Sequence, residues 1–150
     1  MIQLRHVGVY VNDLKSQTEF YRRVFDMHEI CDNIRQQDAL VSELLSAKEP
    51  VEITKLVTMY GKKNGAGDML ELIRYSNSAY KVTEDYPIYK TGVAHLGFGI
   101  DNITETVSRI KALGGKQKTS IHIMANGNKC CFCQDPEGNW LELIERSHGE

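Results

Sequence analysis

Two histidines and two glutamates stand out in this 150-residue sequence because each type recurs in one short context. His6 is followed by Val-Gly, and His95, 89 residues later, is followed by Leu-Gly. Glu71 and Glu142, which are 71 residues apart, each lie in a Gly-x-x-Leu-Glu-Leu-Ile run. Imidazole nitrogens with carboxylate oxygens are a donor set that transition metals accept. The repeat therefore predicts one divalent metal ion held by His6, Glu71, His95 and Glu142.

Each of these residues has a simpler interpretation when it is taken alone. A histidine in a strand is usually a core or surface residue, and a glutamate between leucines is usually the solvent-facing member of an amphipathic strand, so single matches give false positives. An ionised carboxylate in an apolar strand is costly unless it is exposed, paired or metal-bound. Recurrence of the same His and Glu in both halves favours the metal. Nitrogen ligands argue against calcium and leave Ni, Zn, Co, Mn or Fe.

The elements that must position these residues follow one order, β-α-β-β-β, in both halves. Apolar β-type runs at 2–11 and 93–100 open the halves, and each run leads to a polar turn and a helix. The remaining strands are expected at 28–35, 51–60 and 68–75 in the first half, and at 117–124, 128–134 and 139–145 in the second. In the runs around Glu71 and Glu142, alternation turns the flanking leucines to one face and the glutamate to the other.

The helices and turns carry their own signals. Asn12 or Asp13 is expected to cap the first helix and Asp101 or Asn102 the second, because short polar side chains accept from the first free amides. Gly114-Gly115 predicts a left-handed end to the second helix. The apolar helix faces are Leu14, Phe20, Tyr21, Val24 and Phe25 in the first half and Ile103, Val107, Ile110 and Leu113 in the second.

Three further segments connect the strands. Asn126-Gly127 is typical of a tight hairpin, and Asp135-Pro136-Glu137-Gly138 of a type I turn. The first half is 18 residues longer between the repeated marks (89 minus 71). The extra residues are expected at 38–47, as a short helix or an ordered loop.

Composition limits the classes of function. The net charge is −2, with 41% hydrophobic and 25% charged residues, and no basic stripe suggests a nucleic-acid partner. No apolar run approaches the roughly 20 residues that span a bilayer, and no signal-peptide core is visible. The chain is therefore expected to be cytoplasmic. Cys31, Cys130, Cys131 and Cys133 form a poor disulfide or zinc framework and are interpreted as reduced thiols that pack as small hydrophobes.

The repeated motifs resemble the vicinal oxygen chelate (glyoxalase/bleomycin resistance/dioxygenase) superfamily, most closely its glyoxalase I-like members, which are lactoylglutathione lyase-like. The stretches that carry the resemblance are His6-Val7-Gly8-Val9, Met69-Leu70-Glu71-Leu72, Gly92-Val93-Ala94-His95-Leu96-Gly97-Phe98 and Asp135-Pro136-Glu137-Gly138-Asn139-Trp140-Leu141-Glu142-Leu143. The resemblance implies an α+β fold in which two βαβββ modules with pseudo-two-fold symmetry form an open eight-stranded cleft around the metal. It implies a single domain made of module 1 (2–76), a linker (77–90) and module 2 (91–146).

The ligand set His6, Glu71, His95 and Glu142 is similar to that of bacterial glyoxalase I. The resemblance implies a lyase or isomerase of a small-molecule substrate, with Glu142 as general base, Glu71 as its partner, and a homodimer. Tyr10 stands where glyoxalase I has an Arg for the glutathione carboxylate, and Tyr75 stands near the place of its glutathione-contacting Asn. Two alternatives stay open, a binding protein without turnover and a ferrous dioxygenase.

Overall fold

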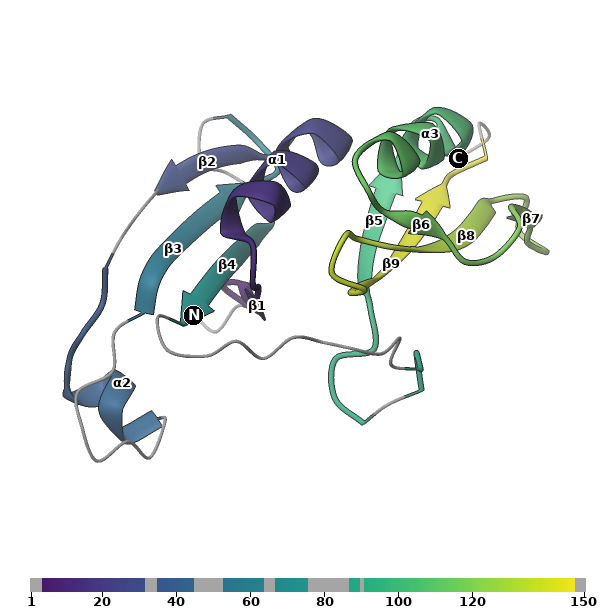
Figure 1. The fold of residues 1–150 in the computed structure, drawn as a ribbon. Helices are drawn as coiled ribbons and strands as arrows, with labels where there is room; N and C mark the ends of the chain where they lie inside the picture. Colours follow the sequence, from purple (N-terminus) through teal and green to yellow (C-terminus); the bar gives the residue numbers. More distant parts are fainter. Residues whose placement is uncertain are drawn as a thin grey trace. The chain divides into compact units, whose positions relative to one another are not determined.

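The structure is a computed structural model that describes residues 4–31, 35–44, 53–63, 67–75, 87–89 and 91–147, without the side chains of 54–56 and 75 (Figure 1). The chain divides into two compact units, residues 1–81 and 82–150. Most of the predicted linker at 77–90 lies outside the described residues. No helix in the described ranges is long and apolar enough to cross a bilayer.

The first unit is a four-stranded sheet, as far as the described residues show, in the order β1-β4-β3-β2. Strand β1 runs parallel to β4, whereas β3 is antiparallel to both β4 and β2. Helix α1 packs on β3 and β4. The elements are β1 (Val7–Tyr10), α1 (Leu14–Phe25), β2 (His28–Cys31), α2 (Ala39–Leu44), β3 (Ile53–Tyr60) and β4 (Met69–Tyr75).

The core of this unit lies between α1 and one face of the sheet. Tyr21 and Phe20 are 0% and 1% exposed, and Leu72 and Met59 on the strands are fully buried. The helix begins where Asp13 Oδ1 accepts from Ser16 N at 2.9 Å, which confirms the predicted cap. The short helix expected within 38–47 is observed as α2.

The second unit repeats this topology, in the order β5-β9-β8-β6, with β7 also paired to β8. Strand β5 is parallel to β9, and helix α3 packs on β6, β8 and β9. Asn102 caps α3 by accepting from Glu105 N at 3.0 Å, as predicted. The elements are β5 (Leu96–Ile100), α3 (Ile103–Ala112), β6 (Lys116–Gln117), β7 (His122–Ile123), β8 (Lys129–Gln134) and β9 (Trp140–Glu145).

The strand predicted at 117–124 is wrong as a single element, since it is divided into β6 and β7. Thr119 is the physical reason. Its hydroxyl accepts from Phe132 N at 2.9 Å in place of a backbone carbonyl, while Lys118 N and Thr119 N both donate to Phe132 O. A side chain thus interrupts the ladder, and the described residues give sheets of four and five strands where eight strands were expected.

The turns and the helix end follow the predictions. Gly138 N donates to Asp135 O at 3.1 Å, which closes the turn between β8 and β9. Gly114 has φ +87° just after α3. Gly115 is required for a different reason, since a β-carbon there would lie 2.6 Å from Gln134 O. The α+β class and the repeated β-α-β-β-β order are confirmed, whereas the cleft and the single domain stay predictions.

Candidate metal-binding residues

The first predicted pair of ligands comes together at the parallel strands β1 and β4. His6 immediately precedes β1, and its Nε2 lies 3.1 Å from Glu71 Oε2 in the middle of β4. The register pairs Gly8 with Glu71. A histidine two residues before the paired position therefore reaches diagonally across to the carboxylate.

The second pair has the same construction. His95 immediately precedes β5, Gly97 pairs with Glu142 on β9, and His95 Nε2 lies 3.1 Å from Glu142 Oε2. Glycine leaves this carboxylate uncovered, since a β-carbon at Gly97 would already be 3.8 Å from Glu142 Oε2. The two units thus contain the same local arrangement, although their sequences share little outside the repeated motifs.

Both glutamates lie on the sheet face opposite the helix, as alternation predicted. Leu70 and Leu72 are at most 4% exposed, and Leu141 and Leu143 are 0% exposed. The Glu71 side chain keeps 20% of its surface accessible, and the Glu142 side chain keeps 25%. The carboxylates are therefore partly desolvated yet still open to a ligand from solution.

The geometry of each pair fits two ligands of one transition metal ion. With metal–ligand bonds of about 2.1 Å, neighbouring donor atoms lie about 3.0 Å apart in an octahedral shell and about 3.4 Å apart in a tetrahedral one. The observed 3.1 Å falls in this range for both pairs. It is also the length of an ordinary imidazole–carboxylate hydrogen bond. Within the described ranges, no three His, Cys, Asp or Glu side chains gather around one metal position.

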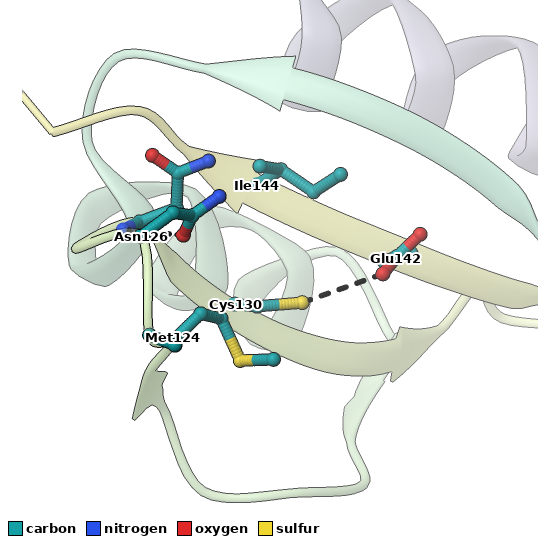
Figure 2. Close-up of a pocket in the computed structure, with 7 residues that line it drawn as sticks. Met124, Asn126, Cys130, Glu142 and Ile144 are labelled. Carbon is teal, nitrogen blue, oxygen red and sulfur yellow. Dashed lines mark hydrogen bonds between the residues drawn. The ribbon is translucent and has the colours of Figure 1, made fainter.

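Glu142 has a second partner that the sequence interpretation missed. The Cys130 thiol on β8 donates to Glu142 Oε1 with an Sγ–O distance of 3.5 Å (Figure 2). Burial, followed by the hydrogen bond to Glu142 and the charge of that carboxylate, raises the pKa of the Cys130 thiol. The group beside Glu142 is therefore a protonated thiol at neutral pH.

A pocket of about 400 Å³ opens beside this contact. Its wall is formed by side chains from β8, β9 and the β7–β8 turn, as Figure 2 shows. The residues that line it are Met124, Ala125, Asn126, Asn128, Cys130, Glu142 and Ile144. The wall thus combines apolar side chains with two amides and one carboxylate, a mixture typical of small-molecule pockets.

The other cysteines of β8 behave as predicted. Cys131 and Cys133 are 1% and 0% exposed in the core, with their sulfurs 4.0 Å apart. The neighbouring Cys131 thiol and burial raise the pKa of the Cys133 thiol. Alternation along β8 distinguishes Cys130 from these two residues and could have revealed its different role.

Aromatic rings support His95 from the side. The Phe132 ring meets the His95 imidazole edge-on with centroids 5.5 Å apart, and the Trp140 ring meets Phe132 at 6.4 Å. Lys118 Nζ lies 5.6 Å above the Trp140 ring. Trp140 therefore shares the face of Glu142, but it is not among the residues that line the pocket.

A family model described as the Glyoxalase/Bleomycin resistance protein/Dioxygenase superfamily matches residues 3–143. The lactoylglutathione lyase of Haemophilus influenzae is 25% identical over 146 residues, which cover 96% of this chain and 93% of that protein. A probable chloroplastic lactoylglutathione lyase of Arabidopsis thaliana is 32% identical over 76 residues. This chain covers only 22% of that longer protein.

Solved structures match over nearly the whole chain. A glyoxalase family protein from Bacillus cereus superposes with a TM-score of 0.79 at 17% identity, covering 97% of this chain and 94% of the other. A mutant of the fosfomycin resistance protein FosX from Listeria monocytogenes, complexed with Mn(II) and a dihydroxypropylphosphonic acid, has a TM-score of 0.64 at 21% identity, covering 99% and 94%. At these identities the structural matches establish the fold alone.

Proposed function

Because this chain belongs to the glyoxalase/bleomycin resistance protein/dioxygenase superfamily, we propose that it is a metal-dependent lyase or isomerase of the glyoxalase I type. The reaction moves a proton at a carbon next to a carbonyl group of a small organic substrate. His6, Glu71, His95 and Glu142 together hold one divalent ion, which is Ni, Zn, Co, Mn or Fe. The two modules work as one domain, and the active protein is a homodimer.

One observation carries this proposal, the His–Glu pair that is built twice with the same register and the same 3.1 Å distance. The recurrence at matching positions supports one common role for the two pairs. Four ligands leave two positions of an octahedral shell for substrate oxygens. When bound, the ion supplies a Lewis acid that stabilises negative charge on those oxygens.

The chain's own carboxylates move the proton. Glu142 is the general base, since a carboxylate must come within hydrogen-bond reach of the acidic carbon and Glu142 is the acid that lines the pocket. Glu71 holds the corresponding place in the first unit and takes the partner role. Lactoylglutathione lyase relatives support this reaction class, although at 25% identity they leave the substrate open.

Tyr10 bears on the choice of substrate. It lies on β1, two residues beyond Gly8, and is 52% exposed. A phenol offers one hydrogen bond and no positive charge, whereas an arginine holds a carboxylate with two charged bonds. The use of glutathione as the substrate carrier therefore stays an open question for the substrate assays. The side chain of Tyr75 lies outside the described residues.

Metal stoichiometry tests the shared site. We expect about one equivalent of transition metal per chain from protein purified without a chelating tag, lost equally in His6→Ala and His95→Ala. The matched control is His28→Ala, at the opposite edge of the first sheet from β1, which should keep the metal. Two equivalents, with one remaining in each variant, would show two separate sites and refute the shared ion.

Activity is tested on the metal-loaded protein with hemithioacetal, α-hydroxy carbonyl and thioester substrates. Glu142→Gln should abolish solvent deuterium exchange at the acidic carbon while metal is retained. Unchanged exchange would refute the assignment of the base. If Ni, Co, Zn, Mn and Fe, offered without oxygen, all fail to bind, the protein is a binding module. Turnover that requires ferrous iron and oxygen would identify a dioxygenase instead.

A further inference from the structure

The two oxygens of Glu142 have different partners. Oε2 lies 3.1 Å from His95 Nε2, and Oε1 lies 3.5 Å from Cys130 Sγ. A carboxylate that is held at both oxygens cannot rotate about its terminal bond without losing one contact. The pair of contacts therefore selects one orientation, in which a single oxygen faces the imidazole.

The backbone register gives Cys130 a counterpart in the first unit. Cys130 pairs with Ile144 in the second sheet, and Leu56 pairs with Ile73 in the first. The sequence therefore places a cysteine two residues before the register partner of Glu142, and a leucine two residues before the register partner of Glu71.

The thiol also lies on the wall of the pocket. Cys130 and Glu142 line this pocket together with Met124 and Ile144 (Figure 2). A small molecule in this space would therefore lie beside both the thiol and the carboxylate to which it donates.

We propose that Cys130 is a positioning residue of this site, whose thiol donates to Glu142 Oε1 and thereby keeps Oε2 directed at His95. The role rests on the proposed function for its effect on turnover. The role assigned to Cys130 is that of a hydrogen-bond donor to the carboxylate, and not that of a metal ligand or a nucleophile.

The hydrogen bond itself is tested without turnover, by infrared spectroscopy of the S–H stretch. The difference between wild type and Cys130→Ala isolates the band of this thiol from those of the other cysteines. We expect the band at lower frequency than in a thiol without an acceptor, and we expect Glu142→Gln to raise its frequency. A band that does not move in Glu142→Gln would overturn the proposal, whether or not the protein binds metal.

Kinetics of the metal-loaded protein test the positioning role. Cys130→Ala should lower kcat about two- to tenfold, the effect of one weak hydrogen bond, with KM changed less. Cys130→Ser keeps a donor of similar size and should stay within about twofold of wild type. Cys31→Ala, a change of the half-exposed cysteine of β2, should leave both constants unchanged.

Two further results would overturn the proposal. An equal rise of KM in Cys130→Ser and Cys130→Ala, with kcat unchanged in both, would mean that the residue only shapes the pocket wall. A thiolate-to-metal charge-transfer band in the cobalt-loaded protein that disappears in Cys130→Ser would mean that sulfur is itself a ligand. If wild type binds no metal, the proposed function fails, and the infrared test still decides the contact.

Discussion

Enlarging Gly97 should weaken metal binding while the fold is preserved. A β-carbon at this position would lie 3.8 Å from Glu142 Oε2, which is ordinary contact, so Gly97→Ala is expected to bind metal normally. Valine adds methyl groups about 1.5 Å beyond the β-carbon. A methyl directed at the carboxylate would approach to about 2.3 Å, well inside the roughly 3.5 Å at which carbon atoms make favourable contact.

The carboxylate must therefore turn away from His95 in Gly97→Val. Disturbing the support of a metal ligand typically lowers affinity 10- to 100-fold, which corresponds to about 1.4–2.7 kcal/mol of binding free energy. The assay is competition between the apo-protein and a chromophoric chelator for cobalt or zinc. Gly99→Val is the matched control, because it lies on the same strand and face, and a β-carbon there meets nothing within 4 Å.

A loss of folding stability should not explain the difference in metal affinity between Gly97→Val and Gly99→Val. Valine favours strands and glycine weakens strand interiors, so both valine variants are expected to melt at or above the wild-type temperature. Equal metal affinity in Gly97→Val and Gly99→Val, with both folded, would refute the reasoning that the glycine keeps Glu142 open toward His95.

Three other predictions concern the stability of the second unit, which contains His95 and Glu142. Gly115→Ala should lower the free energy of unfolding in urea by about 1–3 kcal/mol, because its β-carbon would lie 2.6 Å from Gln134 O. The hydrogen bond with Cys131, followed by burial, raises the pKa of the Cys133 thiol. The stability that this thiol contributes is therefore complete below about pH 8.5, the pKa of an unfolded thiol, and falls as the pH rises above it. In Cys133→Val, the free energy of unfolding should fall less steeply with rising pH. Glu145→Ala should cost about 1.5–3 kcal/mol in thermal unfolding, because the carboxylate accepts from the first amide of α3 at 2.7 Å and from Lys129 Nζ at 2.6 Å. Lys129→Ala should cost under about 1 kcal/mol, since this lysine is 46% exposed, and equal losses in the two variants would contradict the assignment.

Local patterns were enough to predict the sheet face on which each glutamate lies. Strand alternation sends Leu70 and Leu72 to the helix and Glu71 to the other face, and this depends only on the two-residue period of a strand. The helix caps and the turn at 135–138 are equally local. These features could be predicted because the physical cause lies within a few residues of the effect.

The remaining features depend on contacts between distant segments. Thr119 interrupts a strand because its hydroxyl meets Phe132 N, 13 residues away, and no local periodicity encodes that. The contact of Cys130 with Glu142 depends on the register of β8 with β9. The turn between the two strands sets this register, and alternation along β8 then places Cys130 on the other face from Cys131 and Cys133. Assembly of four ligands around one ion depends on packing between the two units, which the periodicity within each unit does not specify.

The two His–Glu pairs also define a structural motif that could be transferred to another protein by design. Its parts are a parallel strand pair, a histidine just before one strand, a glycine two residues later and a glutamate at the paired register. Both units reach the same 3.1 Å separation at the same backbone register. A designer could install this two-ligand cassette on another scaffold with a parallel edge strand and add the remaining ligands from a second copy.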